Sequence, residues 1–190
     1  MAETANWRVS AAALLGVCAA TGCALATVAL AWPATPIAGG LGLASAFEAR
    51  ASRTAAKAPG RPDMTRIARA ETTRSLNHAP ANPTAWLRLA YLDSLQPRGL
   101  GKAGNRALAA SYAVAPYGPD DTAWRLRFAF NHWSRIDRSN RLLVLSELRA
   151  TPSPYSPVDL QASVTDPAGR LALSLENLRR PRETGPAPRI

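Results

Sequence analysis

A short phrase occurs twice in the middle of this 190-residue chain. Residues 79–86 are APANPTAW, and residues 115–124 are APYGPDDTAW. Each copy closes a stretch with helical apolar periodicity and leads into Thr-Ala-Trp, with 36 residues between Pro80 and Pro116 and 38 between Trp86 and Trp124. Periods of this size with two helices per unit are typical of helical repeat proteins, in which each hairpin buries its apolar face on the next. We therefore expect an all-α fold.

The residues around the first copy resemble the tetratricopeptide repeat (TPR) family. In WLRLA, Leu89 follows Trp86 by three residues and Ala90 follows it by four, and Pro116 ends the partner helix. An aromatic residue, a Leu, a neighbouring small residue and a closing Pro form the family's pattern. The resemblance covers about residues 64–150 and implies a short right-handed array of helical hairpins.

The chain departs from the family pattern at several positions. Asp93 stands where the family has Tyr, and Gly104 holds the small position of the second helix. The loop at residues 96–101 is longer than the family's turn, and Arg127 occupies the second unit's counterpart of Leu89. The array is therefore degenerate.

Capping residues and apolar periodicity predict where the helices begin and end. Asn82 can cap a helix whose first residue is Pro83, and Asp120 or Asp121 can cap the next. The apolar faces of these helices include Trp86, Trp124 and Trp133, so we expect these three residues in the core. We expect helices over residues 64–77, from Pro83 to near Leu95, over 102–114, from the Asp pair to Trp133, over 139–150 and over 166–180.

The segment from Val9 to Trp32 contains no charged residue over 24 positions. At about 1.5 Å per residue it spans a hydrocarbon core of roughly 30 Å, so it predicts one transmembrane helix. A cleaved signal sequence is the alternative, because residues 29–31 are Ala-Leu-Ala. Arg8 before the span favours a cytoplasmic N-terminus and a periplasmic C-terminal domain in a bacterial inner membrane, whereas basic residues over 53–74 favour the opposite orientation.

Proline, glycine and alanine content divides the rest of the chain. A short tail precedes the span, and the segment that follows it includes a stretch, residues 49–63, that is low in large apolar residues and interrupted by Pro59, Gly60 and Pro62. The expected order is a tail over 1–8, the span over 9–32, a linker over 33–63, the repeat domain over 64–150, a Pro-rich irregular segment over 151–165, a helix over 166–180 and a disordered tail over 181–190.

The C-terminal helix over 166–180 has two interpretations. Leu171, Leu175 and Leu178 share one face of it. The helix either caps the array or is a detachable segment that binds a partner, and we favour the cap because a terminal unit must cover an exposed apolar face.

The formal charge of +10 suggests binding to nucleic acid or another polyanion. However, 21 of the 23 basic residues are Arg, and with the excess of Ala and Pro this indicates a GC-rich bacterial genome rather than a selected phosphate-binding surface. We therefore do not expect a nucleic-acid partner.

The sequence predicts no reaction. His78 and His132 are the only histidines, and Cys18 and Cys23, the only cysteines, lie in the apolar N-terminal run. No phosphate-binding loop or metal-ligand spacing occurs. We expect no catalytic, cofactor-binding or metal-binding residue.

Our first hypothesis is a non-enzymatic, membrane-anchored scaffold of a bacterial envelope assembly, such as polysaccharide or secretion machinery, that binds a partner protein. This step rests on fold analogy. The alternative is an Arg-rich module that binds an anionic polymer, either acidic polysaccharide or nucleic acid. The candidate partner-binding residues are Arg88, Arg125, Arg127 and Arg135.

Overall fold

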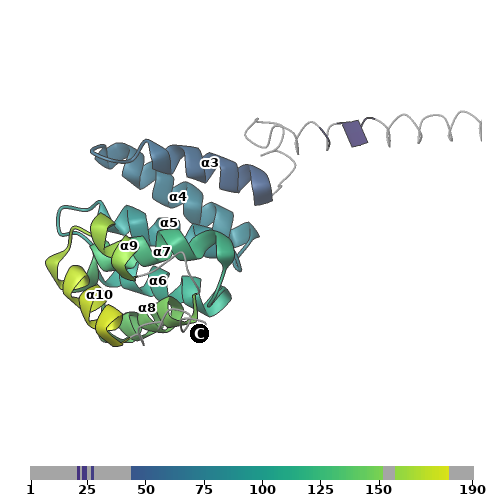
Figure 1. Ribbon diagram of the computed structural model, residues 1–190. Helices are drawn as coiled ribbons and strands as arrows, with labels where there is room; N and C mark the ends of the chain where they lie inside the picture. Colours follow the sequence, from purple (N-terminus) through teal and green to yellow (C-terminus); the bar gives the residue numbers. More distant parts are fainter. Residues whose placement is uncertain (1–20, 22, 25–26, 28–43, 152–156, 180–190) are drawn as a thin grey trace, which may run out of the picture. The chain divides into compact units, whose positions relative to one another are not determined.

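The structure is a computed structural model that describes residues 44–151 and 157–179, together with residues 21, 23, 24 and 27 (Figure 1). Every secondary-structure element in this described part is a helix, which confirms the predicted all-α class. The chain divides into two compact units, Met1–Pro80 and Ala81–Ile190. The predicted membrane span lies outside the described residues, except at those four positions.

The first unit contains helices α3 (Ala44–Ala56) and α4 (Pro62–His78), which pack against each other. Helix α3 shows that the linker predicted over 33–63 was wrong for this stretch. Its buried positions are alanines, such as Ala51 at 0% exposure. Small side chains let two helix backbones approach closely, so α3 contributes no large buried residue, and Leu76 of α4 is the large apolar side chain buried in this pair.

Polar and aromatic contacts also join α3 to α4. The Ser75 hydroxyl donates to the Glu48 carboxylate at 3.0 Å, and the Thr54 hydroxyl donates to Glu71 at 2.6 Å. The ring of His78, at the end of α4, stacks on Phe47 at a centroid distance of 4.3 Å.

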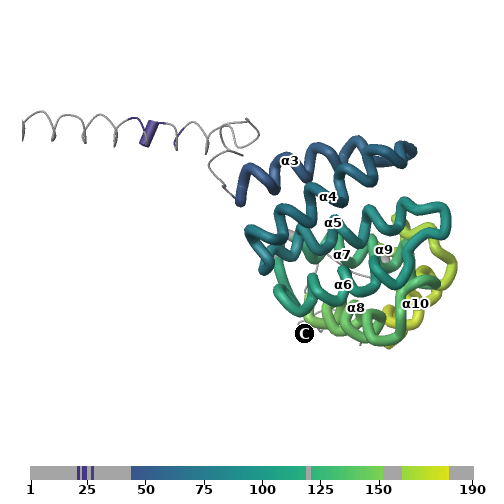
Figure 2. The backbone as a smooth tube through the Cα atoms, turned by 180° about the vertical axis from the view of Figure 1, so that it is seen from behind, coloured from purple at the N-terminus to yellow at the C-terminus, as the bar shows by residue number. Residues whose placement is uncertain are grey.

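The second unit contains most of the predicted helices. The tube in Figure 2 follows them in order: α5 (Pro83–Ser94), α6 (Lys102–Val114), α7 (Pro119–Asn131), the 3-10 helix η1 (Trp133–Arg135), α8 (Arg138–Ala150), α9 (Pro157–Ser163) and α10 (Pro167–Arg179). The expected helices are confirmed to within a few residues. Helix α9 corrects the prediction that the whole of 151–165 is irregular.

Side-chain caps help to set several helix starts, those of α5 and α8 among them. The Asn82 side chain accepts a hydrogen bond from the Ala85 amide at 3.3 Å, as predicted, and Asp137 caps α8. The cap predicted from the Asp pair was wrong, because Gly118 is the N-cap of α7. Asp121 lies one turn inside and accepts a hydrogen bond from Thr84 at 2.9 Å.

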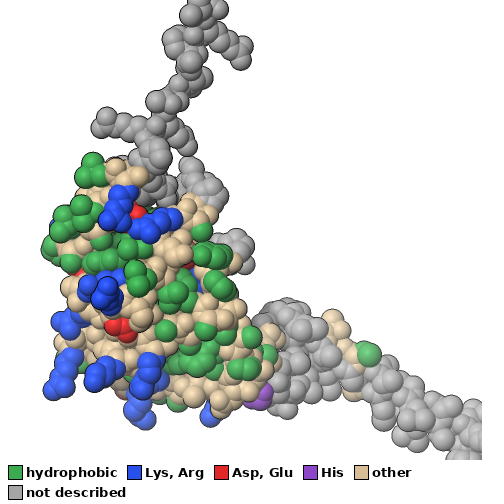
Figure 3. Space-filling view, turned by 90° about the horizontal axis from the view of Figure 1, so that it is seen from below, with side chains coloured by type: hydrophobic (Ala, Val, Ile, Leu, Met, Phe, Trp, Pro, Cys, Tyr) green, Lys and Arg blue, Asp and Glu red, His purple; other side chains and the backbone are tan. Residues whose placement is uncertain are grey.

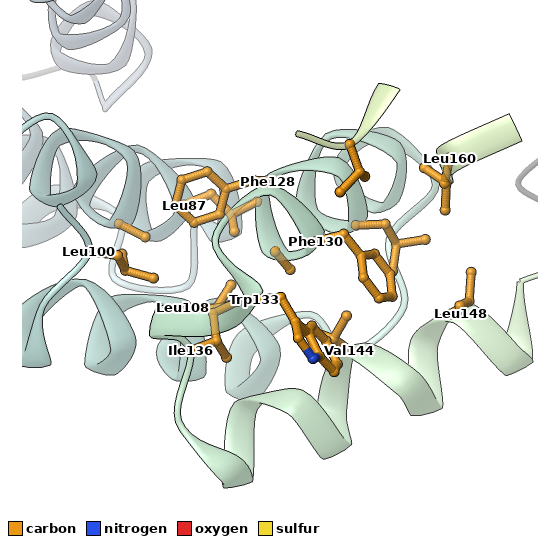
Figure 4. Close-up of a cluster of buried hydrophobic side chains, with 14 of the residues drawn as sticks. Leu87, Leu100, Leu108, Phe128, Phe130, Trp133, Ile136, Val144, Leu148 and Leu160 are labelled. Atoms are coloured by element: carbon orange, nitrogen blue, oxygen red, sulfur yellow. The ribbon is translucent and has the colours of Figure 1, made fainter. Parts of the chain in front are cut away.

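The core of the second unit joins α5, α6, α7, η1 and α8, and α9 and α10 add Leu160 and Leu173 to it (Figure 4). Helix α5 packs on α6 and touches α7, while α6 touches α8. Trp133 is 8% exposed, as a core residue should be, and Trp86 packs partly buried against the core. Trp124 is 41% exposed, which corrects its placement in the core.

Asp93 and Gly104, which both depart from the TPR pattern, depend on each other in the first hairpin. The Asp93 carboxylate, at the end of α5, accepts hydrogen bonds from the Gly101 and Gly104 amides at 2.8 and 2.9 Å, and so caps α6. A Cβ atom at Gly104 would collide with the Leu100 side chain and would lie 2.7 Å from that carboxylate. The carboxylate cap therefore requires glycine at this position.

Candidate functional site

Arg125 of α7 forms the centre of a buried polar cluster. The Arg125 and Glu147 side chains are both 0% exposed and form an ion pair between α7 and α8. The Arg125 Nε donates to both carboxylate oxygens at 3.1 Å. Its Nη1 and Nη2 donate to the carbonyl oxygens of Ala115 and Pro116 at 2.9 and 3.0 Å. One guanidinium therefore joins α7, α8 and the turn after α6.

Two hydroxyl groups complete the coordination of the Glu147 carboxylate. The Tyr112 hydroxyl donates to it at 2.7 Å and the Thr122 hydroxyl at 2.8 Å. Burial, and next the negative charge of Glu147, raise the pKa of Tyr112 well above its usual range, which keeps the phenol protonated as a donor. The Arg125 guanidinium also lies over the Tyr112 ring, 4.1 Å from its centroid.

This cluster corrects the expectation that Arg125 lies on a partner-binding surface. Sequence periodicity places arginine outside because a lone buried charge is costly, but here a carboxylate and two carbonyls compensate that charge. Thr122 and Ala129 lie one turn away from Arg125 on α7 and are both buried. Small residues on a buried face around an arginine are the signal that could have revealed this pocket.

The other candidate arginines have different surroundings. Arg88 is only 9% exposed, so it offers little surface to a partner. Arg135 is exposed, but its Nη1 donates to the Arg98 carbonyl and its side chain passes over Gly99, which has a φ of 68° in the loop before α6. Arg127 is exposed on α7. The structure does not bring the four arginines together into one patch.

An apolar groove of about 320 Å³ lies beside the buried cluster. Residues from α6, from the turn after it and from α8 line the groove: Ala109, Tyr112, Ala113, Pro116, Tyr117, Leu143 and Ser146. Tyr117 is 60% exposed and its hydroxyl lies 3.2 Å from the Ser146 hydroxyl. The groove is therefore lined mainly by apolar groups, and the exposed Tyr117 can both pack and hydrogen-bond there.

Sequence reasoning missed this groove, although the sequence contains a signal for it. The α6 segment ALAASYA, residues 107–113, places alanine at most positions. Ala109 and Ala113 of this segment line the space toward α8 and leave part of it unfilled. The buried Arg125 cluster fixes Tyr112 at the base of this space, so the groove is held open by a rigid part of the core.

Aromatic side chains stack on one another along α7. Trp124 stacks on Phe128 at 5.0 Å between centroids, and Phe128 stacks on His132 at 4.5 Å. The Tyr91 ring of α5 meets Trp124 edge-on at 6.2 Å. Burial lowers the pKa of His132, although its hydrogen bond with the Phe128 carbonyl opposes this effect. The neutral imidazole is thus part of the packing.

Among the described residues, no three His, Cys, Asp or Glu side chains gather where they could hold a metal ion. His78 and His132 lie in the two separate stacks described above. Cys23 is exposed with a free thiol. Within the same described part, no helix has both the length and the apolar character needed to span a membrane.

No protein-family model, no curated protein and no solved structure matches the chain. The structure is compatible with a helical repeat.

Proposed function

We propose that this chain is a non-enzymatic interaction scaffold of a bacterial envelope assembly, and that its helical domain binds a segment of a partner protein. The groove between α6 and α8 is the observation that carries the proposal. Its alanines and tyrosines form an apolar surface with polar tips, the composition that favours binding of peptide segments. We propose this groove, in place of the four arginines, as the binding site.

The TPR-like interpretation belongs to this proposal. It is supported by the contacts between α5 and α7 and between α6 and α8, since equivalent helices of successive hairpins are neighbours in such an array. The Thr-Ala-Trp phrase occurs near the start of both α5 and α7, which gives the two hairpins a common sequence signature.

We also propose that residues 9–32 anchor the chain in the inner membrane, with the helical domain in the periplasm. The apolar length of that segment supports the anchor. A reporter active only in the periplasm, fused after Ile190, should give activity in the membrane fraction. Activity from a cytoplasm-only reporter at the same position would contradict the proposed orientation.

The burial of two arginines favours a protein partner over an anionic polymer. Arg125 and Arg88 are buried, so two of the four candidate partner-binding arginines have little or no surface to offer to an anionic polymer.

Filling the groove tests the proposal. Ala113 is exposed on α6 at the groove, and Ala103 is exposed on the same helix but does not line it. In affinity capture from the native membranes, Ala113→Arg should lose the partner that the unmodified chain retains, whereas Ala103→Arg should keep it. Equal capture by both variants would refute binding through the groove, and no capture by the unmodified chain would refute the scaffold function.

A further inference from the structure

Helix α10 has a buried face and an opposite, exposed leucine face. Leu173 is 0% exposed, and Gly169 lies so close to the Phe130 carbonyl that a Cβ atom there would collide with it. By contrast, Leu171, Leu175 and Leu178 are 62%, 52% and 79% exposed. The helix is therefore docked by one side and leaves these three leucines in solvent.

The spacing of the exposed leucines is that of a coiled-coil seam. Leu171, Leu175 and Leu178 are separated by four and three residues, the interval between successive d, a and d positions of a heptad. Ala168 is exposed at the preceding a position. We call these four residues the α10 seam. A strict a/d stripe is narrower than the apolar face of a helix that lies on a lipid surface, and it fits the knobs of a single neighbouring helix.

The edge of the α10 seam is positively charged. Arg179 occupies the e position beside Leu178. The guanidinium of Arg149, from α8, lies at the same edge, where it donates to Glu176 of α10. Both guanidiniums bond one carboxylate, Glu176, at 2.6 Å from Arg149 and 3.4 Å from Arg179. These three groups carry one net positive charge, and both arginines are more than half exposed. Figure 3 shows a face of the molecule on which exposed hydrophobic side chains lie next to Lys and Arg.

The geometry points to the α10 seam as a docking site for a helix of another protein, one with its own a/d leucines and with glutamate or aspartate at its flanking e/g positions. The leucines supply the apolar contact, and the positive edge selects an acidic helix. A second copy of this chain fits less well, because its α10 would bring another positive edge instead of the negative charge that this edge requires. This surface is separate from the groove residues and extends the proposed scaffold function to a second partner contact.

The probe is a designed 21-residue helical peptide with leucine at its a/d positions and glutamate at its e/g positions. The matched control peptide has lysine at e/g. We would measure binding to the full chain, held in nanodiscs of phosphatidylcholine, by fluorescence anisotropy, with empty nanodiscs as the blank. The acidic peptide should bind at least about tenfold more tightly than the basic one, the range that charge complementarity gives at such edges.

Variants of the chain locate the binding. Leu175→Ser should weaken binding of the acidic peptide at least about tenfold, as expected for an anchor residue at the centre of an interface. Arg179→Ala should weaken it by about twofold to fivefold, as expected for an exposed ion pair. Val114→Ser, on an exposed residue of α6, should leave it unchanged, and so should Ala113→Arg, which fills the groove.

Three results would overturn the inference. The first is equal affinity for the acidic and basic peptides, or binding that Leu175→Ser does not weaken. The second is a dimer of the full chain in sedimentation that Leu175→Ser dissociates, since a second copy would then occupy the seam. The third is binding to phosphatidylglycerol vesicles that depends on Leu175, without binding to the peptide. Each result leaves the groove proposal standing, because Ala113→Arg tests that proposal separately.

Discussion

Replacing Arg125 with methionine would remove the positive half of the buried ion pair and leave the Glu147 carboxylate without its counter-charge. Both side chains are 0% exposed, so solvent cannot compensate the remaining charge. Breaking such a pair from one side costs about 3–5 kcal/mol. A domain has a total stability of about 5–15 kcal/mol, so this variant should lose a large share of it.

A second substitution should recover part of that loss. Adding Glu147→Gln to Arg125→Met removes the buried negative charge and keeps an oxygen that can accept from Tyr112 or Thr122. The double variant should therefore be more stable than Arg125→Met alone by about 1–3 kcal/mol, the cost of one unsatisfied buried polar group. A gain in stability from the second substitution is informative, because two independent destabilising substitutions would add and make the double variant less stable than Arg125→Met.

Urea titration of the intact chain, followed by helical ellipticity, measures these differences. Arg127→Met on the same helix is the matched control, since Arg127 is exposed and its loss should cost no more than about 0.5 kcal/mol. If Arg125→Met cost less than about 1 kcal/mol, the range of exposed ion pairs, a stabilising role of the buried Arg125–Glu147 pair would be refuted. A double variant less stable than Arg125→Met would refute it as well.

Three further predictions follow from single contacts. Gly104→Ala should cost roughly 1–3 kcal/mol in the same titration, because the added methyl group meets the Leu100 side chain and the Asp93 carboxylate. An unchanged midpoint would show that both side chains can move away. Burial lowers the pKa of His132, so the folded state prefers the neutral imidazole. The stability of the chain should therefore fall as the pH drops below the unfolded-state pKa of about 6.5. If His132→Gln showed the same dependence of stability on pH between about pH 7.5 and 5.5, this prediction would be contradicted. Burial alone would raise the pKa of Asp166, but hydrogen bonds from the backbone amides of Ser134 and Ala168 dominate and lower it. Asp166→Ala should therefore cost about 1 kcal/mol at pH 7, and the difference in stability from the unmodified chain should shrink as the pH falls below about 4. A difference at pH 2.5 as large as that at pH 7 would contradict stabilisation by the ionised Asp166.

The helices of the second unit could be predicted because their signals are local. Asn82 and Pro83 mark the start of α5, and Ala-Pro closes both α4 and α6. Helix α3 could not be predicted by the same rules, because its buried face consists of alanines and its partner supplies the complementary shape. Apolar periodicity detects large side chains, and here the packing depends on small ones.

The binding surfaces were harder to predict than the helices. Arg125 was placed on the surface because arginine is rarely buried, and only the three-dimensional position of Glu147 makes its burial favourable. The groove is a space between α6 and α8, so it depends on the distance between helices and not on either sequence alone. The leucines of α10 were correctly placed on one face, and the helix does pack on α7 and η1. Its sequence did not show which side packs inward, and the buried leucine is Leu173 and not one of the three that share the predicted face.

Photo-crosslinking in living cells tests the central claim, that the α6–α8 groove binds a protein partner, most directly. A photoreactive phenylalanine analogue would replace Ala113 in the groove, and in a second strain Ala103 outside it. We predict one discrete crosslinked protein in the membrane fraction from position 113 and none from position 103. The absence of a crosslink at position 113, or the same crosslinks at both positions, would contradict the account.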